Sequence, residues 1–331
     1  MGEIRQDPTT KEWVIMAKDR AERTRDSVPE RVRKDLPMYS PTCPFCPGNE
    51  EMTPPDVLSY SDEKTGRWGV RVVANRFPAV TPEGTTKRRL EDSFFLSMDS
   101  VGIHEVIVEC PEHNKTPDAM DPDALTQVLM AYQERYKALS RLPFVKSIII
   151  FKNHGPRAGT SLDHPHSQLV AVPVVPTETR ARYEVAIRHY DDNGSCLYMD
   201  LVRQEQDSGT RIVMESNGFV VFHPFASKYP FETWIMPKKH EASFGNASQG
   251  DLAGLADALH NTMTKLRRAV DNADFNLVLD SAPVGDEGKE YYLWHIRIIP
   301  RLTEIAGFEI GTGIHINTSL PEETARAMRD A

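Results

Sequence analysis

The 331-residue sequence predicts an α+β fold in which an antiparallel sheet is assembled from two similar halves. Short β-branched runs bounded by turn residues, such as 147–151 and 169–172, are typical of strands. Two longer segments, 123–140 and 249–271, repeat apolar residues with helical spacing. The order of strands and helix in the first half recurs in the second half. Such self-similarity indicates an internal repeat.

Composition and charge limit the class of protein. Hydrophobic residues make up 40% and charged residues 26%, as in ordinary globular proteins. The formal net charge of −9 argues against a nucleic-acid scaffold, which usually carries a basic surface. No apolar run reaches the roughly 20 residues of a membrane helix, and residues 1–7 lack the apolar core of a signal peptide. We therefore expect a cytoplasmic protein that binds neither nucleic acid nor a membrane.

The first half is expected to span residues 1–176. Its helix starts at Asp121 with a proline in the first turn. The helix should bury one stripe of side chains, formed by Leu125, Val128, Leu129, Tyr132 and Tyr136. The expected elements are, in order, strands at 13–16, 69–80 and 102–110, the helix at 123–140, and strands at 147–151 and 169–172.

The second half is expected to span residues 177–331. A charged segment, 177–210, is helical at its start and joins the halves. The later helix should bury Leu252, Leu255, Leu259, Met263 and Leu266. The other expected elements are strands at 218–222, 232–236, 275–279 and 291–299. In this alignment His295 and Arg297 take the places of His164 and His166, so only the first half keeps both imidazoles.

A C-x-x-C pair, Cys43 and Cys46, lies in a Pro-rich segment. Two thiolates with this spacing can reach one ion, and zinc takes tetrahedral sulfur and nitrogen ligands. A redox pair is the alternative, but it usually starts a helix, which Pro47 and Gly48 disfavour. Without an export signal, a close cysteine pair is more often a metal site than a disulfide. We therefore expect zinc, with two further ligands from elsewhere in the chain.

The stretch 163–168, Asp-His-Pro-His-Ser-Gln, carries the strongest chemical signal. If a strand opens at His164, then His164, His166 and Gln168 share one face. Such a row is a poor choice for packing, because buried polar groups need partners. Two buried structural histidines are the alternative interpretation.

Two arrangements of the histidines are possible. Both can bind one metal, or His164 can join Cys43, Cys46 and His113 in a closed Cys2His2 site while His166 faces a substrate. The residue counts favour the second arrangement, since four ligands leave no open position. The metal site would then anchor the strand that carries His166.

A neutral imidazole that attacks phosphorus needs its far nitrogen protonated and hydrogen-bonded, typically to a backbone carbonyl. Gln168, on the same face as His166, can donate to a phosphoryl oxygen as charge develops. The charged run 18–25, which contains Arg20 and Arg23, is either a solvated loop or an anion clamp, because guanidinium groups suit phosphate oxygens.

The row resembles the histidine-triad (HIT) superfamily, and specifically its nucleotidylyltransferase branch, the galactose-1-phosphate uridylyltransferase type. Hydrolases of that superfamily have a third histidine where this chain has Gln168, whereas the transferases have glutamine. The residues that look like the signature loop are Asn153, Ser161, His164, Pro165, His166 and Gln168. The resemblance covers nearly the whole chain.

The resemblance implies a fold and a set of sites. The fold is a duplicated HIT-like half-barrel, and the protein forms a homodimer with the interface near the active site. Cys43, Cys46, His113 and His164 match structural zinc ligands, and His166 and Gln168 match the catalytic pair. The substrate-contacting positions are matched by Arg20, Arg23, Asn75, Asn153 and Ser161.

By this resemblance, His166 attacks the α-phosphorus of a nucleotide sugar and the sugar 1-phosphate leaves. The nucleotide, most simply UMP, then passes to a second hexose 1-phosphate, as in galactose metabolism. Arg76 stands where uridylyltransferases have aspartate, and the pattern at 311–317 looks more like adenylyl-transferring ADP-glucose phosphorylases, which are the alternative. A non-enzymatic zinc-dependent binding module ranks lower, because it leaves His166 and Gln168 without a purpose.

Overall fold

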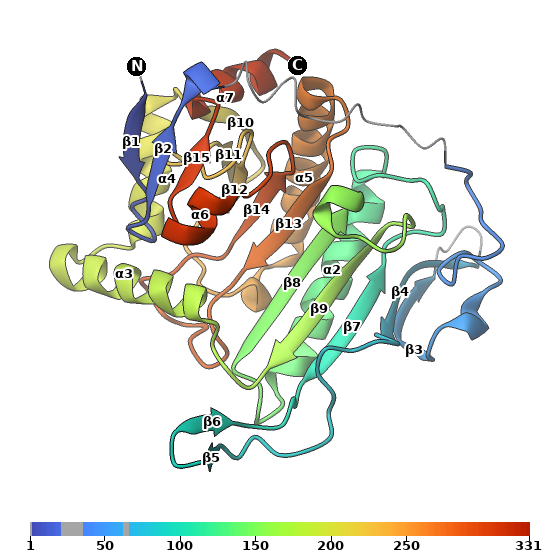
Figure 1. Ribbon diagram of the computed structural model, residues 1–331. Coiled ribbons are helices and arrows are strands. Elements are labelled where there is room, and N and C mark those ends of the chain that lie inside the picture. Colours follow the sequence, from blue (N-terminus) through green and yellow to red (C-terminus); the bar gives the residue numbers. More distant parts are fainter. Residues whose placement is uncertain (1, 21–35, 62–65) are drawn as a thin grey trace.

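A ten-stranded, fully antiparallel sheet forms the centre of the molecule (Figure 1). The computed structural model describes residues 2–20, 36–61 and 66–331. Across the sheet the strands are β10 (Ile212–Ser216), β11 (Phe219–Phe222), β12 (Thr233–Pro237), β14 (His295–Pro300), β13 (Phe275–Asp280), β8 (Ser147–His154), β9 (His166–Val172), β7 (Ile103–Val108), β4 (Trp68–Ala74) and β3 (Asp56–Ser61).

The two sides of this sheet have the same topology. From the central β8–β13 pair outward, the order is β8-β9-β7-β4-β3 on one side and β13-β14-β12-β11-β10 on the other. Each side follows the chain as three outer strands, a long helix and an inner hairpin. The helices are α2 (Pro122–Ser140) and α5 (Gln249–Val270). The element order that recurs in the sequence is therefore also the order in space.

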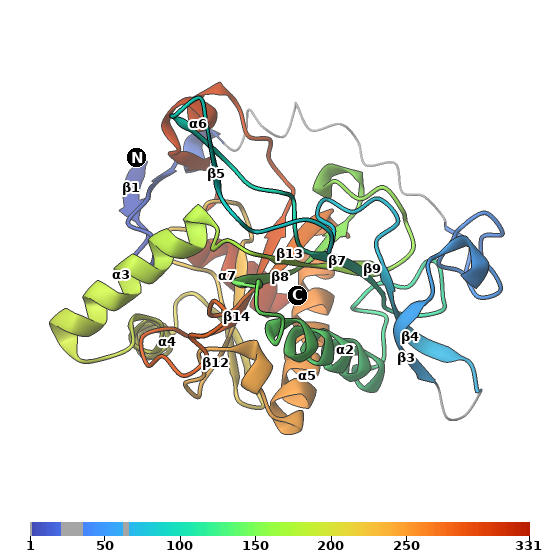
Figure 2. The same ribbon diagram turned by 90° about the horizontal axis from the view of Figure 1, so that it is seen from below.

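Helices α2 and α5 lie side by side on one face of the sheet (Figure 2). Both predicted apolar stripes are buried there, against the core-facing residues of the inner strands. Each helix start is capped. Asp121 accepts a hydrogen bond from the Asp123 amide, and Ser248 forms a capping box with Asp251. The sequence prediction for these helices is confirmed to within one residue at either end.

The opposite face is covered differently in the two halves. Over β11 and β12 it packs against α3 (Thr177–Asn193) and α4 (Leu197–Ser208), which form a second core. In the first half the loop that contains Cys43, Phe45 and Cys46 packs on Val106 and Val108. The β9 residues nearby are less covered, and Gln168 is only half-buried. The first half therefore keeps the more open face.

The remaining elements lie outside the ten-stranded sheet. The strands β1, β2 and β15 form a small separate sheet, and β5 and β6 form a hairpin that projects from the molecule (Figure 1). Their bounds are β1 (Glu3–Gln6), β2 (Trp13–Met16), β15 (His315–Asn317), β5 (Arg89–Glu91), β6 (Phe95–Ser97), α6 (Gly307–Thr312) and α7 (Pro321–Asp330), with 3-10 turns η1 (Lys18–Arg20), η2 (Glu50–Met52), η3 (Pro156–Ala158) and η4 (Phe244–Asn246). Across the described ranges, no helix combines the length and the apolar character that a membrane span requires.

Two expected strand starts are wrong. Strand β9 begins at His166, not at His164, because His164 turns away into a loop. Strand β14 begins at His295, since Tyr291–Trp294 form a loop whose apolar side chains fill the second core and the main core. His164 therefore does not share a strand face with His166 and Gln168.

Candidate functional site

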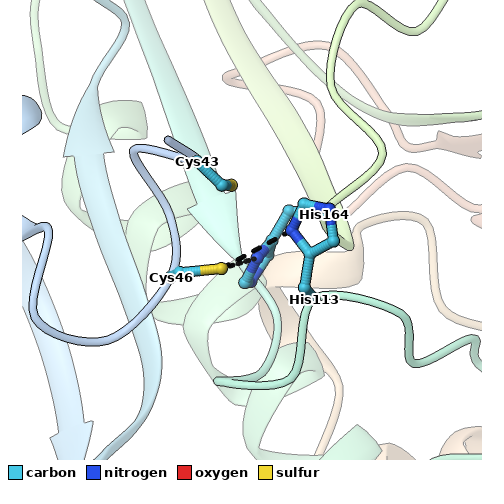
Figure 3. Close-up of side chains that lie close together, drawn as sticks. All are labelled: Cys43, Cys46, His113 and His164. Carbon is cyan, nitrogen blue, oxygen red and sulfur yellow. Dashed lines mark hydrogen bonds between the residues drawn. The ribbon is translucent and has the colours of Figure 1, made fainter. Parts of the chain in front are cut away.

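Four buried side chains from three loops converge at one end of β9. Cys43 and Cys46 precede η2, His113 follows β7, and His164 precedes β9 (Figure 3). Their ligand atoms all lie within 4.8 Å of one another. Within the described ranges this is the one group of this kind. The structure thus brings together the four ligands predicted from the sequence.

The donor set fits a tetrahedral zinc ion. Bond lengths of about 2.3 Å to sulfur and about 2.1 Å to nitrogen place a thiolate and an imidazole nitrogen roughly 3.6 Å apart. Cys46 Sγ lies 3.5 Å from His113 Nδ1 and 3.6 Å from His164 Nδ1. Two sulfur and two nitrogen donors with this spacing favour zinc over calcium or magnesium, which prefer oxygen.

The surroundings prepare His164 as a neutral ligand. Its Nε2–H donates to the Cys110 carbonyl at 2.9 Å, so that Nδ1 presents its lone pair toward Cys46. Burial lowers the pKa of His164 to about 4, which keeps the ring uncharged. Burial likewise raises the pKa of the Cys43 thiol to about 11, so a thiolate at this position needs a cation beside it.

His166, the first residue of β9, has a fixed tautomer. Its Nδ1–H donates to the His164 carbonyl at 2.8 Å, which leaves the lone pair on Nε2. Burial lowers its pKa, and the ring packs against Phe45 of the cysteine loop with centroids 5.4 Å apart. This is the neutral imidazole, hydrogen-bonded through its far nitrogen, that nucleophilic attack on phosphorus requires.

A buried polar network supports β9 from the core side. Lys152 Nζ donates to Glu109 Oε2 at 2.6 Å and to the His166 carbonyl at 3.2 Å. Ser167 donates to the same Glu109 carboxylate through a short hydrogen bond, and Tyr132 donates to it at 3.2 Å. The ammonium of Lys152 and hydrogen bonds hold the pKa of Glu109 below its usual value despite complete burial.

Gln168 shares its strand face with His166 and has two partners, His104 on the neighbouring strand β7 and Asn75 in the segment that directly follows β4. Its Oε1 accepts from His104 Nε2 at 2.8 Å and lies 3.4 Å from Asn75 Nδ2. Asn75 was predicted at the site, whereas His104 was not. The available signal was a histidine in the strand that pairs with β9, in a run whose other residues are apolar except for Glu105.

The other residues predicted to contact substrate lie in different parts of the structure. Asn153, at the end of β8, accepts a hydrogen bond from Asn276 Nδ2 at 2.8 Å, which links the halves beside the start of β9. Ser161 is exposed in the loop between η3 and β9. Arg20 is exposed at the end of η1, where Lys18 pairs with Glu323 of α7. Arg23 lies outside the described residues.

The second half repeats the histidine but not the site. His295 opens β14 as His166 opens β9, and its Nδ1–H donates to the carbonyl two residues back, on Leu293, at 3.0 Å. The sequence alignment was therefore displaced by two residues: His295 corresponds to His166, and Arg297 to Gln168. Both lie beneath α3 and α4, where His295 stacks on Trp234 and has no exposed surface.

Comparisons with known proteins agree with this geometry. The family model described as galactose-1-phosphate uridyl transferase, N-terminal domain, matches residues 2–176, more than half of the chain, and one described as a domain of unknown function matches residues 117–330. ADP-glucose phosphorylase of Arabidopsis thaliana is 32% identical over 99% of this chain and 92% of its own. Galactose-1-phosphate uridylyltransferase of Thermotoga maritima is 26% identical over 100% of this chain and 98% of its own. A crystal structure of the Arabidopsis thaliana ADP-glucose phosphorylase with bound ADP-glucose has a TM-score of 0.86 at 30% identity, covering 100% of this chain and 99% of the other. The chain belongs to the galactose-1-phosphate uridylyltransferase family of nucleotidyltransferases.

Proposed function

We propose that this nucleotidyltransferase works through a covalent nucleotidyl intermediate on His166. One observation carries the proposal: burial favours the neutral form of the His166 ring, and the hydrogen bond from Nδ1 to the His164 carbonyl leaves the Nε2 lone pair free, on the strand face that also carries Gln168. A fixed nucleophile with a hydrogen-bond donor on the same strand face is the arrangement that phosphoryl transfer needs.

The reaction proceeds in two displacements. The Nε2 lone pair of His166 forms a bond to the α-phosphorus of a nucleotide sugar, while the bond from that phosphorus to the bridging oxygen breaks and sugar 1-phosphate leaves. The Gln168 amide donates to a non-bridging oxygen as its charge grows. A phosphate oxygen of the acceptor then displaces Nε2, which restores the neutral ring. Two reversible steps of this kind give ping-pong kinetics.

The metal has a structural part in this scheme. Cys43, Cys46, His113 and His164 would hold zinc with no open coordination position, so the ion would supply a cross-link between three loops. His164 then fixes the carbonyl that orients His166.

We further propose adenylyl transfer from ADP-glucose to phosphate as the specific reaction. The support is the greater similarity to the ADP-glucose phosphorylase, at 32% identity, than to the uridylyltransferase, at 26%. Uridylyl transfer between a UDP-sugar and a hexose 1-phosphate, the reaction first expected from the sequence, is the second candidate. It is favoured by the family model over residues 2–176.

Two organisational proposals accompany the function. The matching strand orders support a duplicated HIT-like half-barrel, with the units 1–176 and 177–331 as its two halves. Exposed apolar side chains on the β5–β6 hairpin support a homodimer.

The test is covalent labelling. The purified protein is incubated separately with ADP-glucose, UDP-glucose and UDP-galactose, and its intact mass is measured. We expect an added AMP that disappears, with release of ADP, when phosphate is supplied. An added UMP that galactose 1-phosphate removes establishes the second candidate instead. His166→Ala should abolish the label, and His166→Gly should regain transfer when imidazole is added. Absence of any adduct with all three sugars contradicts the proposal.

A further inference from the structure

We infer that His104 is a positioning residue which orients the Gln168 amide for transfer. This inference rests on the proposed function for its catalytic consequence, but the orientation itself follows from the hydrogen bonds around His104. The ring lies on β7, across from Val170 and therefore diagonal to Gln168 on the same face of the sheet.

The tautomer of His104 is set by the backbone. The Ala79 amide donates to His104 Nδ1 at 3.1 Å, so Nδ1 carries a lone pair and not a proton. The proton of the neutral ring is then on Nε2, and Nε2–H donates to Gln168 Oε1 at 2.8 Å. A backbone amide in the segment after β4 thus determines which nitrogen of His104 faces Gln168.

Asn75 holds Gln168 in the same orientation through a second, independent contact. Its Oδ1 accepts from the Phe77 amide at 2.8 Å, which fixes the side-chain amide so that Nδ2 points into the site. Nδ2 lies 3.1 Å from His104 Nε2 and 3.4 Å from Gln168 Oε1. Two donors therefore converge on one acceptor, the Oε1 atom of Gln168.

These two contacts also determine where the amino group of the Gln168 amide lies. The pairing of His104 with Val170 places these donors on the side of Gln168 that is remote from His166. With Oε1 held there, the amino group of the planar amide faces the His166 side. A glutamine free to flip its amide would also present the Oε1 acceptor to a phosphoryl oxygen, and two acceptors repel each other. His104 removes that orientation.

Two single variants separate the two hydrogen bonds of the ring. In His104→Gln the amide nitrogen reaches the position of Nε2 and can still donate to Gln168. In His104→Asn the shorter amide can accept from Ala79 but cannot reach Gln168. We expect the single-turnover rate of His166 labelling to fall about 10- to 100-fold in His104→Asn. It should stay within about threefold of wild type in His104→Gln, and the melting temperatures of both should match within a few degrees.

A double-mutant cycle decides whether His104 acts through Gln168. When Gln168→Ala is already present, adding His104→Asn should change the labelling rate less than about twofold, because the group to be oriented is gone. Rate losses that multiply, or a His104→Gln variant as slow as His104→Asn, overturn the inference.

A spectroscopic measurement tests the orientation without any turnover. In protein labelled with ¹⁵N-histidine, the His104 signals, assigned by their loss in His104→Asn, should report protonated Nε2 and unprotonated Nδ1. A ring protonated on Nδ1 overturns the inference whatever the activity. If the wild-type protein forms no adduct, the proposed function fails, while the ring tautomer still decides the position of the Gln168 amide.

Discussion

Lys152 and Glu109 form an ion pair of 2.6 Å whose side chains are only 4% and 3% exposed. The pair lies on the core side of β9, opposite the face that carries His166 and Gln168. Lys152 also donates to the His166 carbonyl, and Glu109 accepts from Ser167. The backbone that carries the nucleophile is thus held from beneath by two buried charges, and each charge depends on the other for its partner.

Lys152→Met should strongly destabilise the protein. Removing one member of a buried pair leaves the other charge uncompensated, which costs about 3–5 kcal/mol. Urea unfolding followed by tryptophan fluorescence measures the change. Lys146→Met, a substitution of an exposed lysine just before the same strand, is the matched control and should change stability by less than about 0.5 kcal/mol. Adding Glu109→Gln to Lys152→Met should recover part of the loss. A Lys152→Met protein as stable as wild type contradicts the interpretation.

The cysteine and histidine cluster should bind about one zinc ion per chain, measured by elemental analysis of the purified protein. Cys46→Ser should lose this metal, lower the melting temperature and reduce the labelling of His166, because the loop that packs on the His166 ring is released. Cys196→Ser provides the control, since this cysteine is buried in the second core, directly before α4 and outside the cluster. Full metal retention in Cys46→Ser shows that the ion is held elsewhere.

Asp280→Asn should destabilise the second half in a pH-dependent way. Arg297 and Arg182 contact the Asp280 carboxylate at 2.6 and 2.9 Å. Together with His295 they hold the pKa of Asp280 well below its usual value, although burial opposes this. The stabilisation is therefore fully present above the unfolded-state pKa of about 3.9 and is lost as the pH falls further. Thermal unfolding of both proteins should show a constant gap from pH 7 to pH 5 that narrows below pH 4. If the difference in unfolding temperature between the two proteins widens on acidification, the prediction is contradicted.

The β5–β6 hairpin should lie in the dimer interface. Leu90, Phe94, Phe95 and Leu96 on this hairpin are 60–79% exposed in the single chain, an unusual density of apolar surface. Phe94→Ser combined with Phe95→Ser should shift the molar mass measured by light scattering from dimer to monomer. Ile4→Ser, which removes a comparably exposed residue from β1, should leave the dimer intact. If the double variant remains dimeric, the interface is on another surface.

Local periodicity explains which parts of the fold could be predicted. The α2 and α5 stripes follow from 3.6-residue spacing, and every residue assigned to them is buried. Periodicity could not locate the first residues of the strands that follow polar loops. His164 has strand-like neighbours in sequence, but its ring contacts Cys46 and His113. The next residue, Pro165, has no amide hydrogen to donate to a neighbouring strand, so the strand starts only at His166. The run Tyr291–Trp294 is as apolar as a buried strand, because its side chains fill the two cores, but its backbone forms a loop.

The site shows the same division. The four residues of the cysteine and histidine cluster and the His166–Gln168 pair carry recognisable spacing, so the sequence could name them. His104 and Asn276 have no such spacing, because their partners lie on strands that only the folded sheet places beside them. The catalytic and substrate-binding roles of the predicted site residues stay predictions, those of His166 and Gln168 as much as those of Arg20, Arg23, Asn75, Asn153 and Ser161.

The burial of His295 in the second half predicts that each chain takes up one nucleotide label. His295 keeps the backbone hydrogen bond of a nucleophilic histidine, but α3 and α4 leave it no exposed surface and no route to a nucleotide. A pre-steady-state burst should therefore reach an amplitude of one nucleotide per polypeptide and not two, however high the substrate concentration. A dimer should saturate with two labels, so titration of active sites counts chains, although each chain carries two histidines of the same backbone geometry.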